Sequence, residues 1–495
     1  MAFLRRDIWS MPPDDPYVMA YGDAVGDMQA RPADDPTSWT YQAAIHGTYL
    51  NPPPPLADEC KHGSWFFLSW HRMYLYWFER IVRATVLAKG GPGDWALPYW
   101  NYDTVTTNTL PLAFRNPTRP DGSPNPLYVA PPDRGAGWNA GSLALPPAIT
   151  TPAFALSRPV YVGAPEFGGG VGPANRQFWG ATGRLESTPH NAVHSTLGGW
   201  MGDPGTAAQD PIFWLHHCNI DRIWAVWNDE GHTDPAEDEW RTQPFSFFDE
   251  SGKQVTMTGA DVEDIEHLDY TYTRRFKVPH IKIGPRRLPK DFPWPPWIRM
   301  REPIPVPQPP RQPTGMAADE PGAEMLGASE SSVYLRGDEE RIPLRVDSRA
   351  RELASRDRLE AAEPGAAPRM ILTVEDIEGE RNPSTVYGVY VNLPDNPSLE
   401  DLDTHHAGNV SFFGIERAAR GGDQHAMGLR YAMDITDLVT SLQEHGHWRG
   451  DDIDVTFRPI RPLVVGDRPE LEAELEEGRH EDAPVTIGRV SLHMA

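Results

Sequence analysis

Histidines recur at helical spacing in the stretch from 190 to 224. His190 and His194 stand four residues apart, so on a helix they project from one face and can hold one metal ion together. The apolar segment DPIFWLHHCNIDRIW can supply a third ligand from a second helix, through either His216 or His217. The stretch therefore predicts a metal site that is built from two helices.

A second histidine cluster lies upstream, in IHGTYLNPPPPLADECKHGSWFFLSWHRMYLYWFERI, and it contains His46, His62 and His71. Two sets of three histidines imply two metal ions. Neutral imidazole suits copper, zinc, iron and nickel. The near absence of thiolate and carboxylate among these ligands disfavours a structural zinc site or a di-iron carboxylate bundle. Copper fits best, and Asp221, one helical turn beyond the later histidines, is placed to orient an imidazole.

The order of the motifs along the chain is more specific than either cluster alone. HxxxxN, SWFFLSWHRMYLYWFERI, LPYWNYD, ESTPHNAVH and DPIFWLHHCNIDRIW follow one another. In this order they resemble the copper motifs of the type-3 copper proteins, and most closely those of the plant-type polyphenol oxidases and tyrosinases. The resemblance implies a mainly α catalytic domain in which a four-helix bundle surrounds a dicopper site. It implies His46, His62 and His71 as ligands of the first copper and His190, His194 and His217 as ligands of the second, with His216 a buried, hydrogen-bonded neighbour.

The resemblance also implies a reaction. Two copper ions held by imidazoles, with open positions facing each other, can bind dioxygen and pass two electrons in one step, and small phenols supply those electrons. A tyrosinase or polyphenol oxidase hydroxylates monophenols to o-diphenols and oxidises o-diphenols to o-quinones. A catechol oxidase with diphenolase activity alone and an oxygen carrier of the hemocyanin kind share these ligands. A two-zinc hydrolase is a further alternative, from a different class, that metal analysis would exclude.

Three further residues are candidates for handling the substrate. Glu186, four residues before His190, matches the glutamate that holds a water near the coppers in related enzymes, and Asn191 follows His190 directly. Together they would polarise a water that takes the proton of a monophenol, whose pKa is near 10. Helix capping by Glu186 and solvation of Asn191 are an equally good explanation. Phe213, four before His217, is expected to stack on the substrate ring above the second copper, with a core position as the alternative.

Cys60 stands two residues before His62. In some fungal tyrosinases and molluscan hemocyanins a Cys-x-His of this form makes a thioether between the sulfur and the imidazole. Plant enzymes use a cysteine at the position where this chain has Leu50. The resemblance therefore implies a Cys60–His62 thioether, and an ordinary thiol is the alternative. Asp221 and Arg72 are expected to support the ligands from behind.

Composition limits the partners. The chain has 495 residues, with 45 Lys plus Arg against 70 Asp plus Glu, and this net charge of −25 argues against nucleic acid or an anionic membrane as a partner. Its first residues contain no apolar run that could act as a secretion signal, and no stretch approaches the ~20 apolar residues of a membrane span. We expect a cytoplasmic protein, with export by a helper protein as the alternative. A homo-oligomer is left open.

The pattern along the chain predicts a multidomain protein. Residues 1–278 are expected to form the dicopper catalytic domain, and residues 279–368, rich first in proline and then in charge, a linker. From 369 to 495, alternating segments such as MILTVEDI, TVYGVYVNL and NVSFFGI predict an antiparallel β-sandwich. This part is similar to the C-terminal domain of plant-type polyphenol oxidases, which lies over the copper site as a lid and holds the enzyme latent. A regulatory role is implied.

Overall fold

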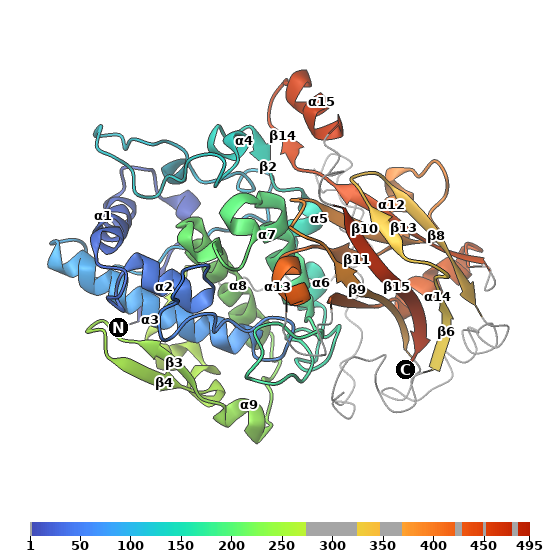
Figure 1. Ribbon diagram of the computed structural model, residues 1–495, viewed down its shortest axis with the longest axis horizontal. Helices are drawn as coiled ribbons and strands as arrows, with labels where there is room; N and C mark the ends of the chain where they lie inside the picture. The colour runs from blue at the N-terminus through green and yellow to red at the C-terminus, as the bar shows by residue number, and fades with distance from the viewer. Residues whose placement is uncertain (1, 274–323, 347–368, 421–427, 449–451, 478–483) are drawn as a thin grey trace, which may run out of the picture.

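A helical N-terminal region and a β-sheet C-terminal region lie against each other in the computed structural model (Figure 1). The structure describes residues 2–273, 324–346, 369–420, 428–448, 452–477 and 484–495. None of the helices in these ranges is long and apolar enough to cross a lipid bilayer.

Four helices of the expected bundle carry four of the six histidines: α2 (Trp39–His46), α3 (Phe67–Ala88), α7 (Ala192–Leu197) and α8 (Ile212–Asp229). A π-helical turn, η3 (Glu186–Asn191), leads directly into α7. The sequence places the start of α3 at Ser64, but residues 64–66 form a turn first, because the chain must leave the loop that carries His62.

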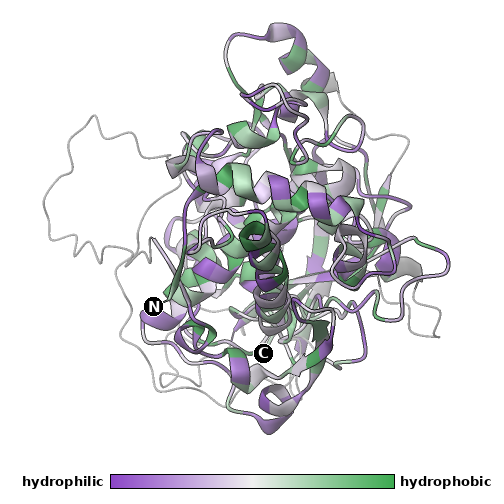
Figure 2. Ribbon diagram, turned by 90° about the vertical axis from the view of Figure 1, so that its left-hand side faces the viewer, coloured by the Kyte–Doolittle hydropathy of each residue, from purple (hydrophilic) through white to green (hydrophobic). Residues whose placement is uncertain are grey.

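Aromatic packing holds the bundle together. Most residues of α3 and nearly all of α8 are buried, which agrees with their apolar character on every side. Tyr74 of α3 packs on Trp214 of α8 with ring centroids 4.8 Å apart, and α1 (Pro16–Ala30) covers α3 from outside. Other helices mix hydrophilic and hydrophobic residues along their length (Figure 2), as expected where one side meets water.

Short elements complete the helical region. Residues 104–180 are largely irregular, with brief helical turns. Strand β1 (Phe3–Arg5) pairs in parallel with β5 (Tyr270–Tyr272), so the two ends of this region are hydrogen-bonded to each other. The remaining elements are α4 (Ala136–Asn139), β2 (Leu143–Ala144), α5 (Pro147–Thr150), α6 (Ala153–Leu156), α9 (Asp238–Thr242), β3 (Phe245–Phe248) and β4 (Gln254–Met257).

The C-terminal strands form one antiparallel sheet in the order β11-β10-β13-β8-β6-β15-β9-β12, with β7 paired to β15. The expected antiparallel β domain is confirmed, but a sandwich would divide these strands between two sheets. Here the outermost strands approach each other, since Tyr431 of β12 donates to the Ser411 carbonyl just after β11 at 2.9 Å. Their bounds are β6 Glu324–Ala328, β7 Val333–Leu335, β8 Glu340–Val346, β9 Met370–Glu378, β10 Val386–Val391, β11 His406–Val410, β12 Leu429–Asp434, β13 Asp452–Ile460 and β15 Val485–Met494.

The interpretation of 279–368 as a linker is wrong for residues 324–346, which form β6, β7 and β8 of this sheet. Charged side chains at exposed positions of these strands hid the alternation in the sequence. The remainder of that range lies outside the described residues. Helices α12 (Leu399–Thr404), α13 (Ile415–Arg420), α14 (Thr436–Glu444) and α15 (Pro469–Glu477) connect the later strands, and β14 (Leu463–Val464) pairs with β2 of the helical region.

Candidate dicopper centre

The first triad is assembled as the spacing predicts. His46 ends α2, His62 lies on the loop before α3, and His71 lies in α3. All three side chains are buried, and their Nε2 atoms have no hydrogen-bond partner among the described residues. Each Nδ1 atom is engaged instead, by the Pro204 carbonyl at 2.9 Å, the Cys60 sulfur at 3.3 Å and the Phe67 carbonyl at 2.8 Å, respectively.

The second triad converges in the same way. The Nε2 atom of His217 lies 3.3 Å from the Nε2 atoms of both His190 and His194. The Nδ1 atom of His190 contacts the Asn191 side-chain oxygen at 2.8 Å, and that of His194 the Met201 carbonyl at 2.7 Å. An N–H at Nδ1 leaves the Nε2 lone pair of each ring free for a ligand.

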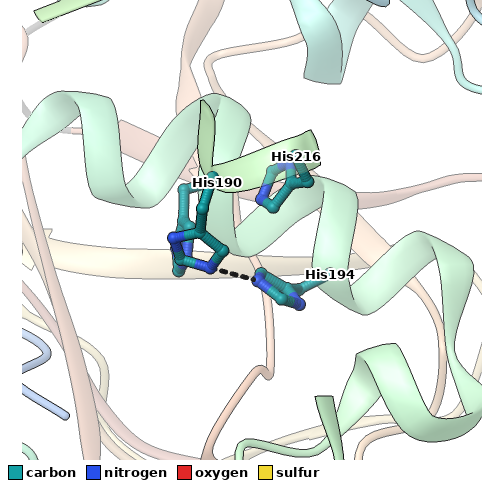
Figure 3. Close-up of side chains that lie close together, drawn as sticks. His190, His194 and His216 are labelled. Carbon is teal, nitrogen blue, oxygen red and sulfur yellow. Dashed lines mark hydrogen bonds between the residues drawn. The ribbon is translucent and has the colours of Figure 1, made fainter. Parts of the chain in front are cut away.

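His216 lies beside this triad but makes a different contact. Its Nδ1 atom lies 3.1 Å from the Tyr102 hydroxyl, so the ring is buried and hydrogen-bonded, as expected. Figure 3 shows His216 close to His190 and His194, and its ring centroid is 4.7 Å from that of His194. The His216 Nε2 atom also has no hydrogen-bond partner among the described residues, and both neighbours lie within reach of His190 and His194, so the choice of His217 as the ligand stays a prediction.

The two triads face each other. The rings of His71 and His217 are stacked at 4.6 Å, and those of His62 and His190 at 5.8 Å. Burial lowers the pKa of all six imidazoles, that of His46 to about 3, so they are neutral. Buried nitrogen lone pairs without a donor are costly, and a metal ion satisfies them. The donor set therefore fits two ions that prefer imidazole, which includes copper.

Glu186 ties η3 to the first triad. Its two carboxylate oxygens accept from the Gly63 N–H at 2.7 and 2.9 Å. Gly63 has φ +65°, and a Cβ there would lie 1.6 Å from the Trp179 carbonyl oxygen, so only glycine fits. Burial raises the pKa of Glu186 to about 8. The carboxylate thus holds the loop beside His62, which is a larger role than a helix cap.

Phe213 contacts both triads. It is fully buried, with its ring centroid 4.1 Å from that of His217 and 4.9 Å from that of His46. It packs against one histidine ring of each triad, and stacking on a substrate stays a prediction.

The expectation that Asp221 orients an imidazole is wrong. Its carboxylate accepts from Arg72 at 2.5 Å and Arg5 at 3.1 Å, and from the hydroxyls of Tyr270 and Tyr272 at 2.6 and 2.5 Å. Burial opposes ionisation, but the two arginines keep the pKa of Asp221 below its ordinary value. Asp221 lies one turn beyond His217, but its carboxylate is bonded to Arg72 of α3 and to the tyrosines of β5 and not to an imidazole. Asp221 and Arg72 therefore fix the bundle on its far side.

The C-terminal domain reaches the second triad through residues 411–417, which follow β11. Phe413 stacks on His194 with ring centroids 4.0 Å apart, and it is 2% exposed. The Phe412 backbone N–H donates to the Ser195 hydroxyl at 3.1 Å, which fixes this segment to α7. Tyr431, whose pKa burial raises to about 12, faces Asn191.

Sequence reasoning missed several of these residues. Backbone carbonyls such as those of Met201 and Pro204 orient histidines without any side-chain signature. Phe413 was included in a strand pattern, NVSFFGI, although the strand ends at Val410. The glycine at position 414 was the sequence signal for a turn, and in the structure it has φ +82°.

Comparison with known proteins agrees with this arrangement. The common central domain of tyrosinase matches residues 36–141 and 166–230, and the polyphenol oxidase middle domain matches 234–286. A domain family of unknown function matches 322–495.

Whole-chain relatives carry the same plan. Tyrosinase HcTyr1 of Hahella sp. (strain CCB-MM4) is 32% identical, over 96% of both chains. Polyphenol oxidase A1 of Vicia faba is 28% identical over 90% of this chain and 73% of its own. The structure of latent apple tyrosinase superposes over 100% of this chain and 97% of its own with a TM-score of 0.58 at 22% identity, a likeness of fold.

Facing histidine triads inside a helical bundle, with a β domain against them, define the class as a type-3 dicopper protein. The chain belongs to the tyrosinase and polyphenol oxidase family of copper oxidoreductases.

Proposed function

We propose that this protein is a tyrosinase that hydroxylates monophenols to o-diphenols, oxidises o-diphenols to o-quinones, and is kept latent by its C-terminal domain. His46, His62 and His71 would hold one copper, and His190, His194 and His217 the other. The copper pair, when bound, activates dioxygen and accepts two electrons from a phenol. The observation that carries the proposal is the opposition of two buried sets of Nε2 atoms, with His71 and His217 stacked at 4.6 Å.

Asn191 supports the monophenol step. Its side-chain oxygen is engaged by His190 at 2.8 Å, so its amide group is fixed beside the second triad. A monophenol must lose a proton with a pKa near 10 before it binds a metal, and a water held between Asn191 and Glu186 is the proposed acceptor. A diphenol needs this help less, because its first hydroxyl is more acidic.

The variant Asn191→Ala tests this role. We expect a larger loss of kcat on a tyrosine-like monophenol than on the matching catechol. Equal losses on both would refute a selective role, and the copper content of the variant must match that of the parent.

The position of Phe413 supports latency. The proposal has the ring of an aromatic substrate stack on a histidine of the second triad, and Phe413 already stacks on His194. We therefore propose that Phe413 acts as a plug residue, in the position that the ring of an aromatic substrate would take. A catechol oxidase without monophenolase activity is the second candidate, and it is favoured if Asn191 proves indifferent to substrate class.

The Cys60 sulfur lies 3.3 Å from the His62 Nδ1 atom, which supports the proposed thioether. The intact mass of the denatured protein tests the bond. A thioether lowers the mass by two hydrogens, and a mass equal to that calculated from the sequence contradicts it.

Oxygen uptake tests the reaction itself. The copper-loaded protein is given a monophenol or a catechol, before and after limited proteolysis between residues 279 and 323, with quinone absorbance recorded in parallel. We expect slow uptake before cleavage and fast uptake after it. Oxygen binding without quinone formation in the cleaved protein would favour an oxygen carrier. Equal rates of oxygen uptake before and after cleavage would refute the proposed latency.

A further inference from the structure

Gln177 lies at the meeting point of the first triad and the C-terminal domain. Its side-chain Nε2 donates to the Cys60 sulfur at 2.9 Å and to the His46 carbonyl at 3.0 Å. Its backbone carbonyl accepts from the His62 N–H at 2.8 Å. One residue thus contacts the cysteine and the backbone of two copper ligands.

The segment after Gln177 strengthens this hold. Phe178 stacks on the His62 ring at 4.9 Å, with the two planes 11° apart. The Trp179 N–H donates to the His62 carbonyl at 2.9 Å. These contacts fix the His62 ring and backbone, while the Gln177 amide fixes the sulfur beside that ring. The Cys60 side chain, which is fully buried, therefore has a donor on one side and an imidazole on the other.

The C-terminal domain holds Gln177 from the other end of its amide. Arg417 of α13 donates to the Gln177 side-chain oxygen at 3.1 Å and to the Thr48 carbonyl at 2.9 Å, and it forms an ion pair with Asp58. A glutamine amide whose oxygen is bonded to a guanidinium cannot rotate without losing that bond. Arg417 thereby sets which end of the amide faces the sulfur.

We propose that Gln177 is a positioning residue for formation of the Cys60–His62 thioether. Arg417 of the C-terminal domain fixes the orientation of the Gln177 amide. The docked C-terminal domain thereby assists maturation of the site that it covers. The proposal rests on the thioether and the copper chemistry of the proposed function. In the step, the Cys60 S–H bond and one C–H bond of the His62 ring break, and a C–S bond forms. Two protons and two electrons leave, and dioxygen takes them up as hydrogen peroxide.

Alkylation of the denatured protein measures the step directly. Copper-loaded protein is held in air, sampled over time, denatured and treated with iodoacetamide, and the peptide with Cys60 is weighed. A cross-linked Cys60 cannot be alkylated, whereas Cys218, the other cysteine of the chain, is alkylated throughout and serves as the internal reference.

Matched variants separate the parts of the proposal. Gln177→Glu keeps the length and the acceptor for Arg417 but loses the N–H donor, and we expect its cross-linking to slow at least tenfold. Arg417→Gln is expected to slow it less. Arg341→Gln removes an arginine that bonds Asp395 and Leu393 inside the C-terminal domain, and it should react like the parent.

Each outcome decides the proposal. Cross-linking of Gln177→Glu at the parental rate overturns the role of Gln177, and equal rates for the two arginine variants overturn that of Arg417. If Cys60 of the parent protein stays fully open to alkylation, no thioether forms, and both the proposed bond and this inference are refuted. Quinone formation by the same samples reports independently on the proposed reaction, and copper content with thermal unfolding shows that each variant is loaded and folded.

Discussion

Phe413→Ala in the intact chain is the most direct test of how the C-terminal domain blocks substrate access to the copper site. The wild-type side chain is 2% exposed and stacks on His194 at 4.0 Å, so the docked state gains nearly the whole burial of a phenylalanine. That burial contributes about 1.5–3 kcal/mol, which corresponds to about a 10- to 150-fold shift from docked toward open. The truncation also vacates the space above the second triad, even where the domain stays docked.

The assay is the initial rate of catechol oxidation by intact, copper-loaded protein, divided by the rate after cleavage of the chain between 279 and 323. This ratio should rise by about 10-fold or more in Phe413→Ala and change little in Phe413→Leu, which keeps most of the volume. Phe457→Ala, in the core of the C-terminal sheet, controls for general loosening of that domain. Its effect should follow the loss of thermal stability, whereas that of Phe413→Ala should exceed it.

If intact Phe413→Ala oxidises catechol as slowly as its parent and cleavage activates both equally, Phe413 does not block the site. The block would then lie elsewhere in the interface. A rise in KM with unchanged kcat would equally contradict the reasoning, since unplugging must raise the fraction of sites open to substrate.

Three further outcomes follow from the structure. Asp221→Asn leaves Arg72 buried without its full counter-charge and should lower the free energy of unfolding by about 3–5 kcal/mol, measured with denaturant on copper-free protein. Glu186→Gln should stabilise copper-free protein relative to the parent, because burial raises the pKa of Glu186 from 4.5 to about 8 in the folded state. The parent loses stability as the pH rises from about 4.5 to about 8, where the unfolded chain gives up the proton and the folded chain keeps it. The gain should therefore be absent below about pH 4.5 and largest above pH 8, and thermal unfolding from pH 4 to 9 checks the sign. Ser195→Ala removes the acceptor of the Phe412 N–H and should activate the intact chain by only about two- to tenfold in the catechol assay, less than Phe413→Ala, and a larger activation would contradict the ranking.

The histidines could be predicted from the sequence because their signal is local. His190 and His194 share a helix face by their spacing, and the motif order gave the partners of each. Asp221 could not be placed, because its partners Arg5 and Tyr272 lie far away along the chain and no spacing rule connects them. Phe413 was hidden for the same reason: an aromatic residue after a strand looks like core until the other domain is seen.

Residues 324–346 show a different limit. Their strands carry glutamate and arginine at exposed positions, so charge concealed the alternation that marks a strand. Gln177 was missed because a lone glutamine in an irregular loop carries no pattern, although it contacts Cys60 and Arg417.

The parallel pairing of β1 with β5 has a consequence for how the chain is made. Arg5 reaches Glu79 and Asp221 only when β1 lies beside β5, which ends at Tyr272. A nascent chain on the ribosome therefore exposes an incomplete cluster of buried charges until Tyr272 has emerged from the exit tunnel. The helical half should become resistant to proteases only after that point, and the covering sheet is synthesised later still.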